Sequence, residues 1–184
     1  MNALRRALKG LYDRHPQLRV TFDEVEGRTV QRIHEGGEFR LDVVDVVGWT
    51  EQQWRDRLYA EVHRPYDLKV GPVARIVLLR ISPDEHVLSF LFHHIVADMW
   101  SLLICVSEFT KFYEAAIRGT SADLADVKTD YADFVRWQAD LTAGPMGETL
   151  WNYWKQELSG SLPVLDLATD RPRPAIQTYR GDLE

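Results

Sequence analysis

The chain has 184 residues, of which 45% are hydrophobic and 27% are charged, and its formal net charge is −6. This length corresponds to about one domain of ~100–200 residues, and the composition excludes an intrinsically disordered or low-complexity protein. The single cysteine, Cys105, excludes a disulfide scaffold and favours a reducing compartment, while the acidic balance argues against nucleic acid as the main partner.

The first forty residues predict a helix followed by a β-hairpin. Residues 3–14 carry leucines at helical spacing, and Asn2 is a candidate N-cap. Apolar and polar residues alternate over 18–22, which is the period of a β-strand. A turn signal at 26–28 separates this run from a second one at 30–33, so we expect the two runs to pair as a hairpin.

The middle of the chain predicts a helix between β-strands. Residues 39–47 form a β-rich run, and Thr50 and Gln53 have the spacing of a capping box at the start of a helix. One face of this helix is expected to carry Trp54, Leu58 and Val62. Residues 73–81 and 86–92 are nearly continuous apolar runs, which are typical of strands buried on both faces.

Helical patterns dominate the rest of the chain. A long helix is predicted over 99–117, and two shorter ones over 131–141 and 146–158. The long helix is expected to bury Leu102, Leu103, Val106, Phe109 and Tyr113. Residues 171–184 show no core pattern and are expected to be extended. Together these elements predict an α/β fold in which a mixed β-sheet is flanked by helices.

No segment has the pattern of a membrane span or of a secretory signal. A membrane span needs about 18 or more consecutive apolar residues, and no stretch approaches this length. Arg5, Arg6 and Lys9 interrupt the leucines near the N-terminus, so an apolar signal core is absent there. We therefore expect a cytoplasmic protein that does not enter a membrane.

The strongest chemical signal is the segment HHIVADMWS at residues 93–101, where two histidines end a buried strand and an aspartate opens a helix. Because adjacent strand side chains point to opposite faces, His93 and His94 are not expected to face one cavity together. A histidine near its ordinary pKa of about 6.5 can accept or donate a proton at neutral pH. One of the two is therefore a candidate acid–base group, and the other is a candidate structural residue.

Other interpretations of the same residues stay open at this stage. Asp98 is a good helix N-cap, and His93 could be a hydrogen-bonded core histidine. Two histidines and a carboxylate also have the composition of a metal site, but neighbouring strand residues diverge and no further ligand completes a known spacing, so we expect no metal. Ser101 lacks the Gly-x-Ser-x-Gly context of a nucleophile, and Cys105 lies in an apolar run typical of an inert core thiol.

Three motifs in order give the chain a family resemblance. They are RHPQLRVTF at 14–22, HHIVADMWS at 93–101 and YADFVRW at 131–137. These segments resemble the RHxxLRxxF, HHxxxDGWS and YxDFxxW motifs of the condensation domains of nonribosomal peptide synthetases. The segment DRPRP at 170–174 is similar to the family's exit from its first subdomain.

This resemblance implies a chloramphenicol-acetyltransferase-like lobe. A full condensation domain has two such lobes, and this chain corresponds to the N-terminal one over residues 1–169, with the family's opening strand apparently missing. Residues 170–184 would be an extended exit segment toward an absent C-terminal lobe. Because two lobes wall the reaction tunnel, the isolated lobe is expected to be inactive alone.

The resemblance also implies the chemistry. His94, the second histidine of the motif, would face the tunnel in which an amine attacks a donor thioester, either positioning or deprotonating the amine or stabilising the tetrahedral oxyanion. His93 would be buried and structural, and Asp98 would hold the loop through a salt bridge to an arginine. Arg19 is the candidate within this chain, and an arginine of the missing lobe is the alternative. Tyr131, Asp133 and Trp137 would be packing residues of the lobe rather than reactants.

Substrates and partners follow from the same resemblance. Met99, Trp100 and Ser101 are expected to border the substrates. No cofactor would be bound by the chain itself, because peptidyl or acyl carrier proteins present the 4′-phosphopantetheine arm. Carrier proteins and the C-terminal lobe are therefore the expected partners, with no nucleic acid and no membrane.

One residue departs from the family pattern. The family has glycine after the aspartate, whereas this chain has Met99. Glycine permits a positive φ and a close backbone approach to substrate, whereas methionine places a flexible apolar side chain at the tunnel. Met99 would therefore narrow the site, select an unusual substrate or mark a weakened domain.

The main functional hypothesis is amide-bond formation between a carrier-bound acyl or peptidyl donor and a carrier-bound aminoacyl acceptor. A non-catalytic carrier-docking module is the first alternative, motivated by Met99 and the absent second lobe. Basic residues of the first helix would dock the acidic carriers in that case: Arg5, Arg6, Lys9 and Arg14. An epimerization domain or a free-standing acyltransferase of the same superfamily is the second alternative.

Overall fold

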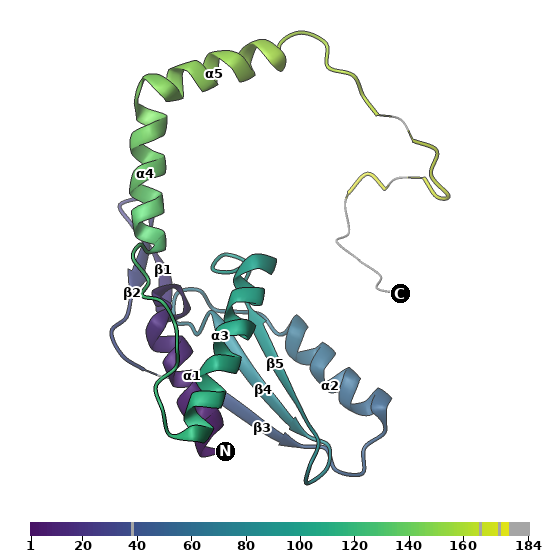
Figure 1. Cartoon of the computed structure of the whole chain (residues 1–184). Coiled ribbons are helices and arrows are strands. Elements are labelled where there is room, and N and C mark those ends of the chain that lie inside the picture. The colour runs from purple at the N-terminus through teal and green to yellow at the C-terminus, as the bar shows by residue number, and fades with distance from the viewer. Residues whose placement is uncertain (38, 166, 173, 177–184) are drawn as a thin grey trace. The chain divides into compact units, whose positions relative to one another are not determined.

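The computed structural model describes residues 1–37, 39–165, 167–172 and 174–176. The chain divides into two compact units, Met1–Asp133 and Phe134–Glu184. The first unit contains both β-sheets and the first three α-helices, and it is shown with the rest of the chain in Figure 1.

The main sheet of the first unit has three strands in the order β3, β4, β5. These are β3 (Leu41–Asp45), β4 (Ala74–Arg80) and β5 (His86–Phe92). β4 pairs in parallel with β3 and antiparallel with β5, so the predicted mixed sheet is present. The central strand β4 is buried on both faces up to its last residue, as its continuous apolar run predicts.

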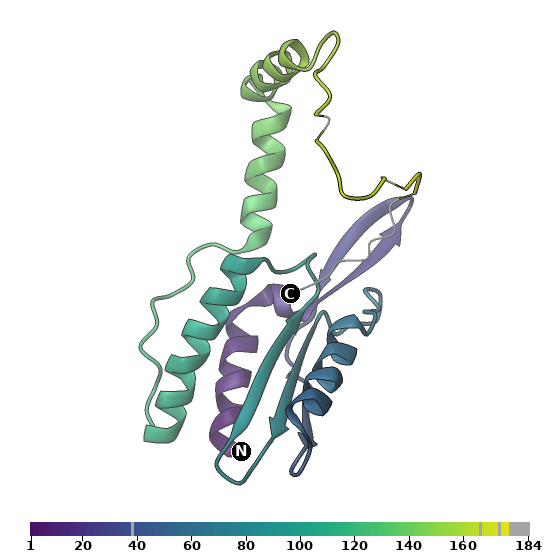
Figure 2. The ribbon, with the colours of Figure 1, turned by 90° about the vertical axis from the view of Figure 1, so that its right-hand side faces the viewer.

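Alternate residues of β4 face two different cores. Ile76 and Leu78 belong to a cluster with the leucines of α1 (Asn2–Arg14) and with Cys105 of α3 (Met99–Arg118). Val77 and Leu79 belong to a second cluster, against which α2 (Glu51–His63) packs. Figure 2 shows the resulting layers, in which α1 and α3 cover one face of the sheet and α2 covers the other.

A separate antiparallel hairpin precedes this sheet. It consists of β1 (Val20–Val25) and β2 (Arg28–Ile33), paired from Val20 opposite Ile33 to Val25 opposite Arg28. The turn residues Glu26 and Gly27 both have positive φ, at 52° and 74°, which is the geometry that joins two strands most tightly. The hairpin predicted from the turn signal is confirmed.

The helix boundaries agree with the sequence more closely than the caps and buried faces do. The capping box of Thr50 and Gln53 is formed in both directions at the start of α2. However, Asn2 is the first residue of α1, whose N-cap is Met1, so the proposed Asn2 cap is wrong. Leu18 is buried in a short 3-10 helix, Pro16–Arg19, rather than in a strand, and Val62 of α2 is exposed.

The buried face of α3 also differs from the prediction. Leu103, Val106 and Tyr113 are exposed, whereas Cys105 and Ala115 are buried. The residues of α3 that pack toward α1 and the sheet include Cys105, Phe109 and Phe112, which recur at helical spacing. Because α3 carries apolar residues on all of its faces, their spacing alone did not identify the face that meets the core.

Two helices follow, α4 (Tyr131–Ala143) and α5 (Pro145–Glu157), and both are confirmed within a few residues of their predicted bounds. The described residues among 171–184 form neither helix nor strand, and the expectation for residues 173 and 177–184 lies outside the described residues. None of the helices in the described ranges combines the length and hydropathy that a membrane span requires.

Candidate functional site

The loop between β5 and α3 carries both histidines. The backbone N–H of His93 donates to the carbonyl of Val73 at 2.9 Å, which extends the pairing of β5 with β4 by one residue. The N–H of Val96 then donates to the carbonyl of His93 at 3.1 Å and closes a turn. The chain therefore leaves the sheet at His93 and enters α3 only a few residues after it.

His93 is half-buried and its ring is held by the loop. Its Nδ1 accepts a hydrogen bond from the backbone N–H of Ile95 at 3.0 Å, so the bond requires a neutral ring with its proton on Nε2. The ring also meets the ring of Tyr66 edge-on, with the centroids 5.5 Å apart. These contacts fix the ring orientation at the base of the turn.

His94 lies next in the chain but is exposed. It borders two hollows of the first unit, one of about 200 Å³ and one of about 280 Å³. The smaller hollow is also bordered by Gln17 and Tyr131, and the larger one by Tyr66 and Met99. His94 is thus the histidine that a molecule in either hollow would meet.

Asp98 caps the first turn of α3. Its Oδ1 accepts hydrogen bonds from the backbone N–H and from the hydroxyl of Ser101, both at 2.8 Å. These two bonds, with a smaller contribution from the charge of His94, hold the pKa of the Asp98 carboxyl below its usual value. The N-cap role considered from the sequence is confirmed.

The proposed Arg19 partner of Asp98 is wrong. The Arg19 guanidinium donates to the carbonyls of His34 at 2.8 Å and of Asp13 at 3.3 Å, so it ties the hairpin to α1. Among the described residues Asp98 forms no ion pair with an arginine. Sequence spacing carried no information about this, because the acceptors of Arg19 are backbone carbonyls.

The three residues after Asp98 point to different surroundings. Met99 is 68% exposed and borders the 280 Å³ hollow together with His94. Ser101 borders the 200 Å³ hollow on the other side of the loop. Trp100 lies beside neither of these hollows and instead borders a separate one with Leu103.

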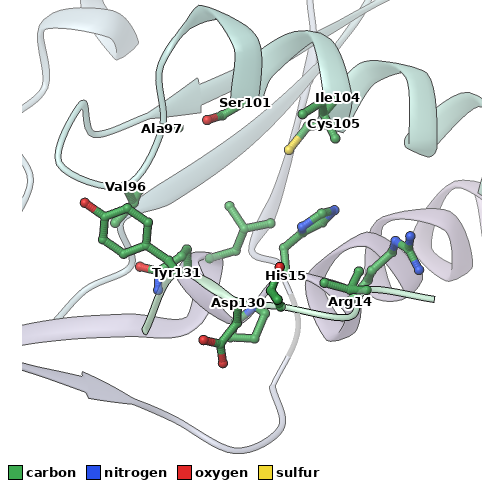
Figure 3. Close-up of a pocket in the computed structure, with 14 residues that line it drawn as sticks. Arg14, His15, Val96, Ala97, Ser101, Ile104, Cys105, Asp130 and Tyr131 are labelled. Carbon is green, nitrogen blue, oxygen red and sulfur yellow. The ribbon is translucent and has the colours of Figure 1, made fainter. Parts of the chain in front are cut away.

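A further cavity of about 240 Å³ adjoins the loop on the α1 side (Figure 3). His15, Cys105 and Tyr131 are among the residues that line it. Arg14 and His15 both bond the carboxylate of Glu108 on α3, with closest distances of 3.0 and 2.6 Å. The first motif therefore joins α1 to α3 next to the loop, a role that its position in the sequence did not reveal.

Cys105 is a poor nucleophile in this environment. It is 5% exposed, and burial, with a smaller effect from Glu108, raises the pKa of its thiol to about 11. The thiol is therefore protonated at neutral pH, as expected for a core cysteine. In the described parts of the chain, no three histidine, cysteine, aspartate or glutamate side chains are grouped closely enough to hold a metal ion.

A buried arginine, Arg75 of β4, lies near the loop, and no pattern in the sequence pointed to it. Arg75 of β4 is 5% exposed and donates to the carbonyls of Glu61 at 3.0 Å and Arg64 at 2.7 Å, where α2 ends. Its guanidinium also lies over the Tyr66 ring, 3.8 Å from the centroid. Arg75 and Tyr66 thus connect the end of α2 to His93.

Comparison with known proteins identifies the family. A family model described as Condensation domain matches residues 1–184. The chain belongs to the condensation-domain family. It is 37% identical over 185 residues to malpinin synthetase of Mortierella alpina, and the match covers 98% of the chain and 2% of that protein. It is 38% identical over 183 residues to the nonribosomal peptide synthetase kk1B of Curvularia clavata, covering 98% of the chain and 1% of that protein.

Solved structures share the fold of this condensation-domain chain. The X-domain from teicoplanin biosynthesis superposes with a TM-score of 0.84 at 30% identity, over 97% of this chain and 40% of the other. The epimerization domain from the third module of tyrocidine synthetase B gives 0.75 at 21% identity, over 91% and 40%, and supports the fold alone. The chain thus has the chloramphenicol-acetyltransferase-like α/β fold, and it spans about two-fifths of these solved chains.

Proposed function

We propose that this chain supplies the histidine-bearing lobe of a domain that joins a carrier-bound acyl or peptidyl donor to a carrier-bound aminoacyl acceptor. The observation that supports it most is the position of His94. This ring is exposed between two hollows, while the neighbouring His93 is held by Ile95 and Tyr66. A donor thioester on one side of His94 and an acceptor amine on the other would meet at its ring.

The reaction requires one bond to form and one to break. The amine nitrogen of the acceptor attacks the thioester carbonyl, the new C–N bond forms, and the C–S bond breaks when the tetrahedral intermediate collapses. The amine loses a proton and the carrier thiolate gains one, so the products are an amide and a free phosphopantetheine thiol. The His94 imidazole would position or deprotonate the amine, or stabilise the oxyanion, and each role is within its chemistry.

The other motif residues would act through the loop. Asp98 holds the first turn of α3 by its two bonds to Ser101, and His93 holds the turn that precedes it. Both are assigned as positioning residues, because their hydrogen bonds hold the loop that carries His94 and the start of α3. The 4′-phosphopantetheine arms would be brought by carrier proteins, and a second lobe would cover the exposed His94 from water.

The test is the rate of amide formation by His94→Ala in a domain that contains this chain with its second lobe. The variant and the wild type receive the same loaded donor and acceptor carriers, and product is measured by mass spectrometry. We expect the rate to fall by about 10²–10⁴-fold, the usual effect of removing one acid–base group. Thermal unfolding should be unchanged because His94 is exposed, whereas a near-normal rate would contradict the proposal.

A docking module is the second candidate function. It is favoured by the likeness to the teicoplanin X-domain, which a solved structure shows in complex with OxyB. Under this alternative, the wild type would bind its protein partner without forming product, and His94→Ala would bind equally well. Product that depends on His94 would exclude it.

A further inference from the structure

The 280 Å³ hollow beside His94 is lined mainly by apolar and aromatic side chains. Tyr66, Phe90 and Phe92 contribute aromatic groups, and the remaining apolar residues are Val62, Leu91, Ala97, Met99 and Leu102. A concave apolar site with few polar groups is the usual form of a pocket for a small apolar ligand group. This hollow is thus suited to an apolar substituent rather than to a charged one.

The two polar residues of the hollow support this interpretation. His94 marks the point at which the reaction would occur, and Asp98 places a carboxylate at the same edge. The two hydrogen bonds from Ser101 favour the ionised form of Asp98, so its charge would repel an acidic substituent. The carboxylate therefore disfavours an acidic substituent on this side of His94, and the aromatic and aliphatic lining favours an apolar one.

One wall of the hollow is fixed by packing. The Tyr66 ring lies under the Arg75 guanidinium and against the edge of the His93 ring. Arg75 is itself anchored by the carbonyls of Glu61 and Arg64. Because these contacts hold the ring on two sides, moving Tyr66 to admit a larger group would cost both of them.

Met99 lines another side of the hollow, and the size of its side chain affects how much space is left there. It occupies the first position of α3, and no positive φ is required there, so methionine causes no backbone strain in place of glycine. Its side chain is 68% exposed at the edge of the hollow that contains His94. An unbranched thioether in this position fills space that a glycine would leave open.

We propose that the hollow between Tyr66 and Met99 receives the apolar substituent of a thioester-tethered substrate, and that Met99 limits the size of that substituent. The inference rests on the proposed function, because it places the substituent beside the reacting His94. The substituent belongs either to the acyl donor or to the aminoacyl acceptor. Both sources present the same apolar chemistry to the hollow.

The experiment compares substrate preference in wild type and Met99→Gly within the two-lobed domain. In the acceptor arm, glycyl and leucyl pantetheine thioesters compete for an acetyl donor. In the donor arm, acetyl and hexanoyl thioesters compete for a glycyl acceptor. The measured quantity is the ratio of kcat/KM for the larger substrate to that for the smaller one. Leu103→Ala is the matched control, because Leu103 is an exposed apolar residue of α3 that does not border this hollow.

We expect Met99→Gly to raise this ratio about tenfold or more in one arm, since even one methylene in an apolar pocket changes discrimination by about 10–200-fold. The arm that responds identifies the substrate whose substituent enters the hollow. Met99→Ala should shift the ratio in the same direction while keeping a good helix former at the start of α3, so a folding defect in the glycine variant does not hide the effect.

A ratio that changes less than twofold in both arms, with product still dependent on His94, would overturn the role of Met99 and leave the proposed function intact. An equal shift in Leu103→Ala would also overturn it. Loss of the proposed function gives a different result, because product in both arms would then be absent or indifferent to His94→Ala.

Discussion

Asp98 is the N-cap of α3, and this structural role can be measured without an activity assay. Its carboxylate caps α3 through the N–H and the hydroxyl of Ser101, and these bonds lower its folded-state pKa. An aspartate with a lowered pKa stabilises the fold above its unfolded pKa of about 3.9, and this contribution is lost as the pH falls through the folded value. Asparagine caps helices about as well but carries no titrating group.

We therefore expect the stability of wild type and of Asp98→Asn to diverge in acid. Between pH 6 and about pH 4 the wild type should be at least as stable as the variant. Below about pH 4 the wild type should lose stability relative to Asp98→Asn, as measured by thermal unfolding followed by circular dichroism. Asp126→Asn, in the loop before α4, is the matched control. Parallel pH curves for wild type and Asp98→Asn would show that the cap is not formed in solution.

The buried thiol of Cys105 should resist alkylation in the folded chain. With a pKa of about 11, only about one thiol in a thousand is ionised at pH 8, and the sulfur is buried as well. Iodoacetamide should therefore leave Cys105 unmodified in the folded chain and modify it readily in urea. Ser107→Cys adds an exposed thiol on the same helix as a control, and mass spectrometry should find that thiol modified first. Rapid native modification of Cys105 would mean that α3 opens.

At the scale of elements, the sequence was informative about where each helix and strand lies. The capping box at Thr50 and Gln53, the turn at Glu26 and Gly27 and the apolar run of β4 each have a local physical cause, and each is present. The buried face of α3 could not be predicted, because apolar residues occur on all sides of this helix. The packing of α3 against α1 and the sheet is what buries Cys105 and leaves Leu103 exposed.

The candidate site, too, could be predicted from the sequence only in part. The motif at 93–101 located the loop and the cap, which depend on neighbouring residues. The hollow beside His94 is also lined by Tyr66, whose ring packs against Arg75 of β4. These residues are distant in sequence, and only the pairing of β4 with β5 and the end of α2 bring them together. This arrangement could not be predicted from any local sequence pattern.

The contacts of Arg75 at the end of α2 should contribute measurably to the stability of the fold. Arg75→Met removes the donor for one buried and one part-buried carbonyl at the end of α2, as well as the cation beneath which Tyr66 packs. Because hydrogen bonds from a charged donor are worth about 1.5–3 kcal/mol each, we expect the free energy of unfolding to fall by more than about 2 kcal/mol in urea. Arg32→Met, on an exposed position of β2, should change it by about 0.5 kcal/mol or less. Equal effects of the two variants would contradict the anchoring role.

For the whole molecule, the family and the fold are established, and the proposed chemistry depends on the side chain of His94. The chain matches the condensation-domain family over residues 1–184 and covers about two-fifths of the solved chains it superposes on. Its own contribution to the proposed reaction is the loop from His93 to Asp98, held by the cap, by the His93 turn and by the Arg75 contacts. The proposed catalysis requires the His94 side chain of that loop, whereas carrier docking does not.

The proposed role of His94 is tested most directly by measuring carrier binding and chemistry separately in the same sample. Carrier affinity and the single-turnover rate of amide formation are measured for wild type and His94→Ala in the two-lobed domain. We expect the affinity to stay within about twofold while the rate falls by about 100-fold or more, because the proposed role of His94 is at the reacting atoms and not on the carrier surface. Equal rates in the two proteins, or tight binding by both with no product from either, would contradict it.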